Sequence, residues 1–297
     1  MKTPDNWPKA PTIWTEGRTL SVSIPFTWDL PGMLVRLSKP DPSWDRAVVG
    51  GPAVQLLPGF FSELPHVTEG QDMPGVLQRA NPYATRTTTG CPNRCGFCGI
   101  GRGLLEPGGF RELEDWPDLP ILCDNNLLAA SPEHFDRVMD RLEAHGWCDF
   151  NQGLDARLLT EHHAERMARV GKPIVRLALD HIRHADAWEV AFDKLRAAGV
   201  AKSRIRSYAI IGFDSGPDEA WERCAWIESH KVKALPMWFH ALDQLKRNVV
   251  TERQLALGWT DRERRNIMQW HYEHKATHGG PPGYALRTAG RAVAEAV

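Results

Sequence analysis

The sequence predicts an α/β fold in which six strand–helix units form a partial barrel of parallel strands. Short apolar runs begin near residues 84, 120, 147, 173, 204 and 232 of the 297-residue chain, at intervals of roughly 25 to 36 residues. Each interval has room for one strand and one helix. Amphipathic segments separate the runs, and this alternation is typical of strands joined by right-handed crossovers.

Capping residues predict where the intervening helices begin. Ser131 followed by Pro132 marks one start, because serine caps the free amides and proline fits the first turn. Apolar residues at 135, 138, 139 and 142 then share one helix face. Further starts are predicted at Thr160, Asp186 and Gly216.

The rest of the sequence divides into two flanking parts. Residues 1–80, rich in proline and tryptophan, are expected to form a short N-terminal cap segment, and residues 81–245 carry the six units. Residues 246–297 are expected to form a helical extension, with Thr260 and Glu263 spaced as a capping box. The stretch after Gly279 is expected to be loosely ordered.

Composition and charge limit the function classes. Charged residues make up 25% and hydrophobic residues 42%, and the net charge is -1. This is the composition of a globular protein without the basic field of a non-specific nucleic-acid binder. No apolar run is long enough for a membrane span, and the first residues contain no secretory apolar segment. We therefore expect a cytoplasmic protein with no membrane partner.

Three of the six cysteines, Cys91, Cys95 and Cys98, lie together in CPNRCGFC. This spacing places three thiolates on one loop, and thiolates are the ligands of iron–sulfur clusters. Three protein ligands leave one iron of a four-iron cluster open to a non-protein ligand. The alternative is a zinc-stabilised binding module, but structural zinc usually takes four ligands. No other Cys or His lies within twenty residues on either side, although Cys123 could complete the set in space.

The cysteine stretch resembles the signature of the radical S-adenosylmethionine (SAM) superfamily. The resemblance implies a TIM-like partial barrel, a 4Fe–4S cluster on the three cysteines, and SAM bound to the open iron. Phe97 matches the family's aromatic residue before the third cysteine, and its backbone is expected to meet the adenine. The implied activity is reductive cleavage of SAM to a 5′-deoxyadenosyl radical, which takes hydrogen from a substrate. The implied electron donor is a protein such as flavodoxin or ferredoxin.

Two further features bear on the cofactors. No cysteine lies before Cys91 or after Cys224, so a single cluster is expected. RAVVGGPAVQLLP resembles the last part of the cobalamin-binding domain of some radical enzymes, where a strand ends in a Gly-Gly turn. The Asp-x-His-x-x-Gly element of such domains is missing. Residues 1–80 are therefore a reduced remnant of that domain or an unrelated cap, and cobalamin is not expected to copurify.

The resemblance also implies SAM contacts at the carboxyl ends of strands, where barrel enzymes carry their sites. By position, Asp124 and Asn125 are expected near the methionine amino group. The family's Gly-Gly-Glu motif is missing there, and both residues can instead cap a turn. Asn151 and Gln152 are expected to face the cavity.

The fourth and fifth strands continue this pattern. VRLALD resembles an Arg-then-acid motif, in which Arg176 would meet the cofactor carboxylate and Asp180 a ribose hydroxyl. Burial of these charges requires pairing in any case. YAIIGFDSG resembles an adenine-contacting strand, with Ile211 and Gly212 at the matching places and Tyr208 in place of its first glycine.

Three residues are candidates for a part in the reaction itself. Cys123 can donate a hydrogen atom to a product radical or be a buried structural thiol. Asp155 and Arg157 can bind substrate or pair with each other. The substrate is either a small molecule, which the net charge favours, or a nucleoside or nucleic acid. A basic aromatic helix that can contact nucleic acid or simply face solvent contains Arg262, Arg264, Arg265, Trp270 and His271.

Overall fold

The computed structural model describes residues 10–39, 41–70 and 73–273, which form a mixed α/β fold. Two compact units are present. The described residues up to Cys123, together with His240–Arg247, form the first, which we call the cysteine unit. Asp124–Phe239 and the described residues from Asn248 onward form the second, the sheet unit. Among the described residues, no helix combines the length and apolar character needed to cross a membrane.

The cysteine unit begins with a four-stranded sheet in the order β1-β2-β3-β4. β1 is antiparallel to β2, whereas β2, β3 and β4 are parallel. These strands and the helices that join them are β1 (Thr12–Glu16), β2 (Thr19–Ser23), η1 (Thr27–Asp29), α1 (Leu30–Leu37), β3 (Arg46–Gly50), α2 (Pro52–Leu56) and β4 (Val67–Glu69). The predicted strand before the Gly-Gly turn is β3. The small sheet has an apolar core of its own.

The second part of the cysteine unit carries the cysteine motif. Its elements are α3 (Val76–Ala80), β5 (Ala84–Thr85), β6 (Thr88–Thr89), β7 (Arg111–Glu112) and β8 (Ile121–Leu122). β5 runs parallel to β8, and β6 runs antiparallel to β7. The three cysteines lie between β6 and β7. The chain therefore leaves one short ladder, forms the cysteine loop and returns to the same ladder.

The sheet unit contains a parallel sheet in the order β9-β11-β12-β13, with β10 also paired to β11. Its strands are β9 (Cys148–Phe150), β10 (Leu154–Asp155), β11 (Pro173–Ala178), β12 (Ile205–Ile211) and β13 (Lys233–Trp238). Its longer helices are α4 (Pro132–His145), α5 (Glu161–Arg169), α6 (Ala185–Ala197), α7 (Pro217–Ser229), α8 (Glu252–Ala256) and α9 (Asp261–Glu273). The described strands form an open sheet and do not close a barrel.

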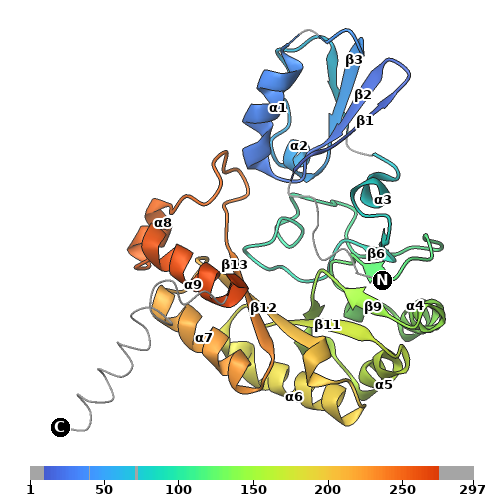
Figure 1. Cartoon of the computed structure of the whole chain (residues 1–297), viewed down its shortest axis with the longest axis vertical. Coiled ribbons are helices and arrows are strands. Elements are labelled where there is room, and N and C mark those ends of the chain that lie inside the picture. Colours follow the sequence, from blue (N-terminus) through green and yellow to red (C-terminus); the bar gives the residue numbers. More distant parts are fainter. Residues whose placement is uncertain (1–9, 40, 71–72, 274–297) are drawn as a thin grey trace. The chain divides into compact units, whose positions relative to one another are not determined.

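Four helices cover one face of this sheet. Figure 1 shows α4, α5, α6 and α7 on the same side of β9, β11, β12 and β13. β12 alternates accordingly, with residues 205, 207, 209 and 211 buried and those between them only partly buried. The indole Nε1 of Trp188 in α6 donates to Ser207 Oγ at 3.0 Å, which identifies the helix-covered face. We call the opposite face, which carries Arg176 and Tyr208, the polar face.

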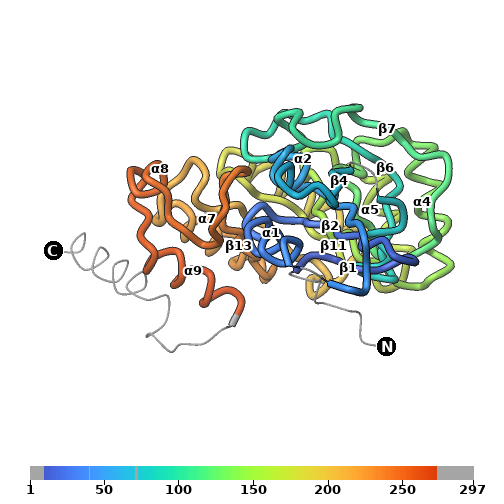
Figure 2. The backbone as a smooth tube through the Cα atoms, turned by 90° about the horizontal axis from the view of Figure 1, so that it is seen from above, coloured from blue at the N-terminus to red at the C-terminus, as the bar shows by residue number. Residues whose placement is uncertain are grey.

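The predicted helix starts are confirmed with small shifts. Ser131 and Thr160 cap α4 and α5, while α6 begins at Ala185, one residue before the predicted Asp186. The last helix begins at Asp261, where Thr260 Oγ1 accepts the amide of Glu263 at 3.1 Å. It packs along β13 and α7 (Figure 2). The predicted loose stretch after residue 279 lies outside the described residues.

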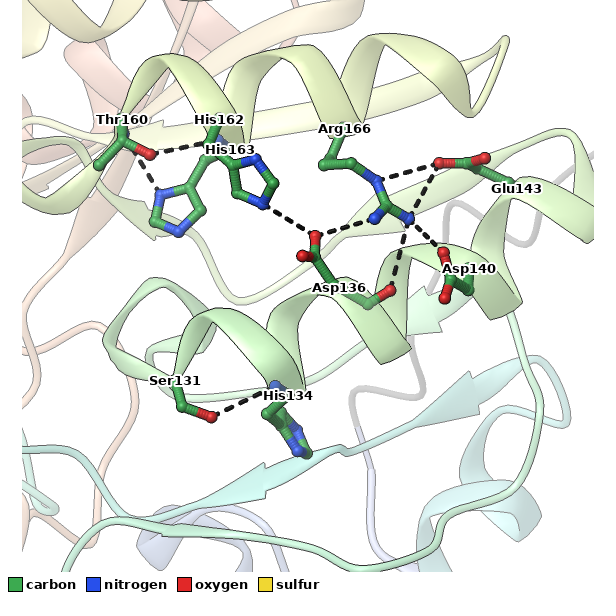
Figure 3. A network of polar contacts seen from close by, with 9 residues as sticks. All are labelled: Ser131, His134, Asp136, Asp140, Glu143, Thr160, His162, His163 and Arg166. Carbon is green, nitrogen blue, oxygen red and sulfur yellow. Dashed lines mark hydrogen bonds and ion pairs between the residues drawn. The ribbon is translucent and has the colours of Figure 1, made fainter.

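A network of charged side chains joins α4 to α5 (Figure 3). Arg166 of α5 lies 2.8 Å from Asp136 and 3.1 Å from Glu143, and it also bonds Asp140. His162 shares Asp136 at 2.8 Å. These contacts fix the two helices to each other on the side of the sheet that the helices cover. We therefore treat this network as structural.

Candidate functional site

The cysteine loop is closed by its own backbone. The amide of Cys98 donates to the carbonyl of Cys95 at 3.1 Å, and the amide of Arg102 donates to that of Cys98 at 3.0 Å. The amide of Asn93 points at the sulfur of Cys91, 3.4 Å away. All three cysteines are partly buried. The loop thus presents three thiols of limited exposure from one tight turn.

Glycine is required where this loop packs on itself. A Cβ atom on Gly101 would lie 2.6 Å from the backbone nitrogen of Cys95. Gly90, which precedes the first cysteine, has φ 68°, and a Cβ there would overlap the carbonyl oxygen of Gly109. Only glycine adopts this conformation without strain and allows such an approach. These two contacts fix how the chain enters and folds back within the loop.

An ion pair that sequence reasoning missed holds the base of the loop. Arg86 donates two hydrogen bonds to Glu106, at 2.7 and 2.9 Å. Glu106 Oε2 also accepts the amide of Gly90 at 2.6 Å. Arg86 precedes the cysteines and Glu106 follows them, so this clamp joins the two ends of the loop. The only signal in the sequence is one basic and one acidic residue 20 positions apart, which is too common to be informative.

The donor chemistry of the loop fits an iron–sulfur cluster. Three thiols on one turn match the ligand set, and an amide aimed at the Cys91 sulfur is the kind of bond that tunes such clusters. Within residues 10–39, 41–70 and 73–273, no three His, Cys, Asp or Glu side chains are already arranged to hold a metal ion. The assignment of the cluster to these cysteines therefore rests on residue type and spacing.

The remaining predicted residues fall in both units. Phe97 is partly buried in the cysteine loop. Cys123 is buried at the end of β8, where its amide donates to Thr85 at 2.8 Å. The burial is in line with the structural-thiol alternative. In the sheet unit, Asp124 is buried and Asn125 partly buried, directly before the turn that leads to α4.

Arg176 has a protein partner on the polar face. Its Nε donates to Asp149 Oδ1 at 2.7 Å and its Nη2 to Asp149 Oδ2, which gives a buried bidentate pair between β11 and β9. Burial lowers the pKa of Arg176, but the hydrogen bonds and charge of Asp149, together with Tyr208, outweigh it and the pKa is raised. Pairing was the requirement expected for a charge buried here. The contact of Arg176 with a cofactor carboxylate stays a prediction.

Tyr208 lies beside this pair. Its hydroxyl donates to the carbonyl of Asn151 at 2.8 Å, and the Arg176 guanidinium lies 5.7 Å from its ring centre. Burial raises the pKa of Tyr208, so the phenol is the form present at neutral pH. Asn151 is therefore joined to the polar face through its backbone. Gln152, the next residue, is exposed.

Asp180 and the adjacent strand end are held together by a buried arginine. Asp180 Oδ1 accepts the amide of Ile210 at 3.0 Å. Burial raises the pKa of Asp180, and the amide and the charge of Arg223 reduce that rise. Arg223 of α7 is 1% exposed and donates to the carbonyls of Leu179 at 3.1 Å and Ile210 at 2.8 Å. Sequence reasoning missed Arg223, because a single arginine on an amphipathic helix is normally solvated.

The next strand end is held by a buried glutamine. Gln254 Nε2 donates to Gly212 at 2.8 Å and to Phe239 at 3.0 Å, which bridges the carboxyl ends of β12 and β13. Gly212 has φ 78°, and a Cβ there would overlap the ring of Trp238. The Ile211 side chain is part of the apolar core. The predicted residues Asp180, Ile211 and Gly212 therefore form one continuous edge.

Asp155 and Arg157 pair with each other, which confirms one of the two alternatives. Arg157 Nε and Nη2 donate to the Asp155 carboxylate at 2.8 and 2.7 Å. Asp155 also accepts the amide of Arg157 at 3.2 Å. The pair caps the short helix η3 (Ala156–Leu158) that follows β10. A part for either residue in substrate binding stays a prediction.

Comparisons with known proteins bear on the fold. No protein-family model matches the sequence, and no curated protein matches it. Among solved structures, the chain is similar to the radical SAM methyltransferase TsrM from Kitasatospora setae, which was solved with cobalamin and a 4Fe–4S cluster bound. The TM-score is 0.52 and the identity 12%, over 74% of this chain and 64% of TsrM, less than two thirds of its length. This similarity concerns the fold, and the chain accordingly has a radical SAM-like fold.

Proposed function

We propose that the chain is a radical SAM enzyme with one 4Fe–4S cluster, bound by Cys91, Cys95 and Cys98. The observation that carries the proposal is a three-cysteine loop of the family's spacing in a chain with a radical SAM-like fold. In this proposal the six strand–helix units form the family's partial barrel. When bound, the cluster would supply the electron that cleaves the carbon–sulfur bond of SAM.

The chain's own residues would bind and orient the cofactor. We propose that Asp180, Ile211 and Gly212 receive the adenosine, because they form one fixed edge of the sheet unit. Asp124, Asn125, Asn151 and Gln152 are proposed contacts by position, and Phe97 is proposed for the adenine. Arg176 would meet the cofactor carboxylate only by sharing its guanidinium with Asp149. The partial burial of the three thiols would limit the access of water and oxygen to the cluster.

The substrate and the partners belong to the same proposal. A small-molecule substrate is favoured over a nucleoside or nucleic acid, because the net charge of -1 provides no general attraction for phosphates. The proposed electron donor is flavodoxin or ferredoxin, and the proposed location is the cytoplasm. Cys123 stays a candidate hydrogen-atom donor within this proposal.

We propose that the N-terminal sheet does not bind cobalamin. The Gly-Gly turn after β3, which resembles a cobalamin-binding turn, is filled by the chain itself. A Cβ on Gly50 would lie 2.7 Å from both Gly70 O and the sulfur of Met73, and one on Gly51 would lie 2.8 Å from Ile24 O. The space that these glycines leave is therefore used for internal packing. No step of the proposed reaction involves a corrinoid.

Anaerobic purification tests the proposal directly. We expect a brown protein with about four irons per chain, and 5′-deoxyadenosine after addition of SAM and a reductant. Cys95→Ala should abolish both, whereas Cys224→Ala, which changes a buried thiol of α7, should retain the iron. A colourless wild-type protein with a single zinc per chain would instead support the binding module. Unchanged 5′-deoxyadenosine production by Cys95→Ala would contradict the assignment.

A further inference from the structure

We infer that Arg223 is a positioning residue that fixes the adenosine edge of the sheet unit from the helix-covered side. This inference rests on the proposed function, because it concerns the edge formed by Asp180, Ile211 and Gly212. Arg223 itself lies on α7 and is 1% exposed, so it cannot touch a ligand on the polar face. Its effect on the cofactor would act entirely through the strand ends.

The hydrogen bonds of Arg223 reach two neighbouring strands. Nη1 donates to Leu179, the residue before Asp180, and Nη2 donates to Ile210, the residue before Ile211. Nη2 and Nε also lie 3.2 and 3.1 Å from the two carboxylate oxygens of Glu219, one turn earlier on α7. Glu219 thus fixes the guanidinium plane. The planar fork holds two carbonyls at a set separation, which a flexible ammonium does not.

Asp180 adds a second side-chain contact to Ile210. Its carboxylate accepts the amide of Ile210, whose carbonyl accepts from Arg223. Both backbone polar groups of Ile210 therefore have side-chain partners, a carboxylate at the amide and a guanidinium at the carbonyl. Carbonyls buried without a hydrogen-bond partner destabilise the fold. The arginine therefore allows two strand ends to finish at one fixed place.

This fixed edge matters because binding sites work best when their geometry is set before the ligand arrives. Gln254 makes an equivalent bridge between Gly212 and Phe239, so the edge is held at two successive strand pairs. A shift of Ile210 would move Asp180 and Ile211 together. The loss of Arg223 should therefore weaken SAM binding without removing any ligand contact.

The test is anaerobic calorimetric titration of SAM into wild-type protein, Arg223→Met and Arg223→Lys, with iron content and thermal midpoint measured on the same samples. Arg223→Met should raise the Kd for SAM roughly tenfold to a hundredfold. Removal of a residue that orients the ligands of a bound metal typically causes a loss of this size. The Kd of Arg223→Lys should lie between those of the wild-type protein and Arg223→Met. Iron content should stay at the wild-type value in both variants. Arg166→Met is the matched control. It also removes an arginine that pairs with carboxylates, in this case three of them, but Arg166 lies away from the strand ends.

Separate outcomes address the two proposals. A wild-type protein that holds no iron and binds no SAM would overturn the proposed function, and this inference with it. A wild-type protein that binds SAM, with Arg223→Met and Arg223→Lys binding equally well, would overturn the positioning role alone. Where Arg223→Met fails to fold, Arg223→Lys decides the question. An equal loss of affinity in Arg166→Met would show a general effect of stability and would also contradict the inference.

Discussion

The cysteine loop and the adenosine edge are held in place in different ways. The loop depends on close backbone approaches at Gly90 and Gly101 and on one partly exposed ion pair, Arg86–Glu106. The edge depends on fully buried polar side chains, Arg223 of α7 and Gln254 of α8. Changes to the loop should therefore affect cluster content first, whereas changes to the edge should affect folding stability and cofactor affinity first.

The largest expected effect is on the polar face. Arg176→Met leaves the Asp149 carboxylate buried without its partner, and breaking such a pair costs about 3–5 kcal/mol. Urea denaturation should show a decrease of that size in the free energy of unfolding. The double variant Asp149→Leu/Arg176→Met should recover most of it. A much smaller loss, together with weaker SAM binding, would favour the cofactor-carboxylate role for Arg176 instead.

A glycine pair separates crowding from backbone strain in the loop. Gly90 and Gly103 have φ 68° and 69°, but only at Gly90 would a Cβ meet another atom, Gly109 O. Both alanine variants carry the strain of a left-handed residue, about 1–2 kcal/mol. Gly90→Ala should in addition displace the entry to the loop and reduce bound iron by more than half, whereas Gly103→Ala should retain it. Equal iron content in the two variants would show that this approach does not position the cysteines.

The ion pair at the base of the loop should have a smaller effect. Glu106→Gln keeps an oxygen that can accept from the Gly90 amide but loses the charge that binds Arg86, whereas Glu106→Ala loses both. Cluster loss in air, followed by visible absorbance, should be fastest in Glu106→Ala and intermediate in Glu106→Gln. Glu114→Ala, at an exposed carboxylate of the same unit, provides the control. Identical decay in all four proteins would show that the Arg86–Glu106 clamp does not protect the cluster.

The smallest effect concerns pH. Burial raises the pKa of Asp180, so the folded chain holds this proton more tightly than the unfolded chain, where the pKa is about 3.9. Stability from this group is therefore greatest below that value and decreases as the pH rises through the folded pKa. Asp180→Asn should flatten this part of the curve measured by urea denaturation. It should also weaken SAM binding while iron content is retained, and an unaltered Kd would remove Asp180 from the site.

The sequence predicted the sheet unit well because its elements carry strong local signals. The apolar runs that became β11, β12 and β13 and the caps at Ser131 and Thr160 are legible within a few residues. Long-range partners were not predictable. Arg223 with Leu179 joins residues 44 positions apart, and Gln254 with Gly212 joins residues 42 apart. Nothing near either residue indicates its partner.

The same distinction applies within the N-terminal region. The strand before the Gly-Gly turn was recognisable, but the other three strands of its sheet were not. β1 and β2 are five-residue strands with polar residues at many positions, so their alternation is weak in the sequence. Only the pairing of β2 with both β1 and β3 shows that residues 12–69 form a sheet with its own core.

The self-closed cysteine turn has a practical consequence for handling this protein. Amides of Cys98, Arg102 and Leu104 bond to carbonyls within the turn, so part of its shape is set by the chain itself. These hydrogen bonds limit the conformational freedom of the turn, which reduces the chain entropy that binding of a cluster would remove. We expect a preparation bleached by oxygen to regain its cluster after mild reduction and the addition of iron and sulfide. No denaturation step should be needed.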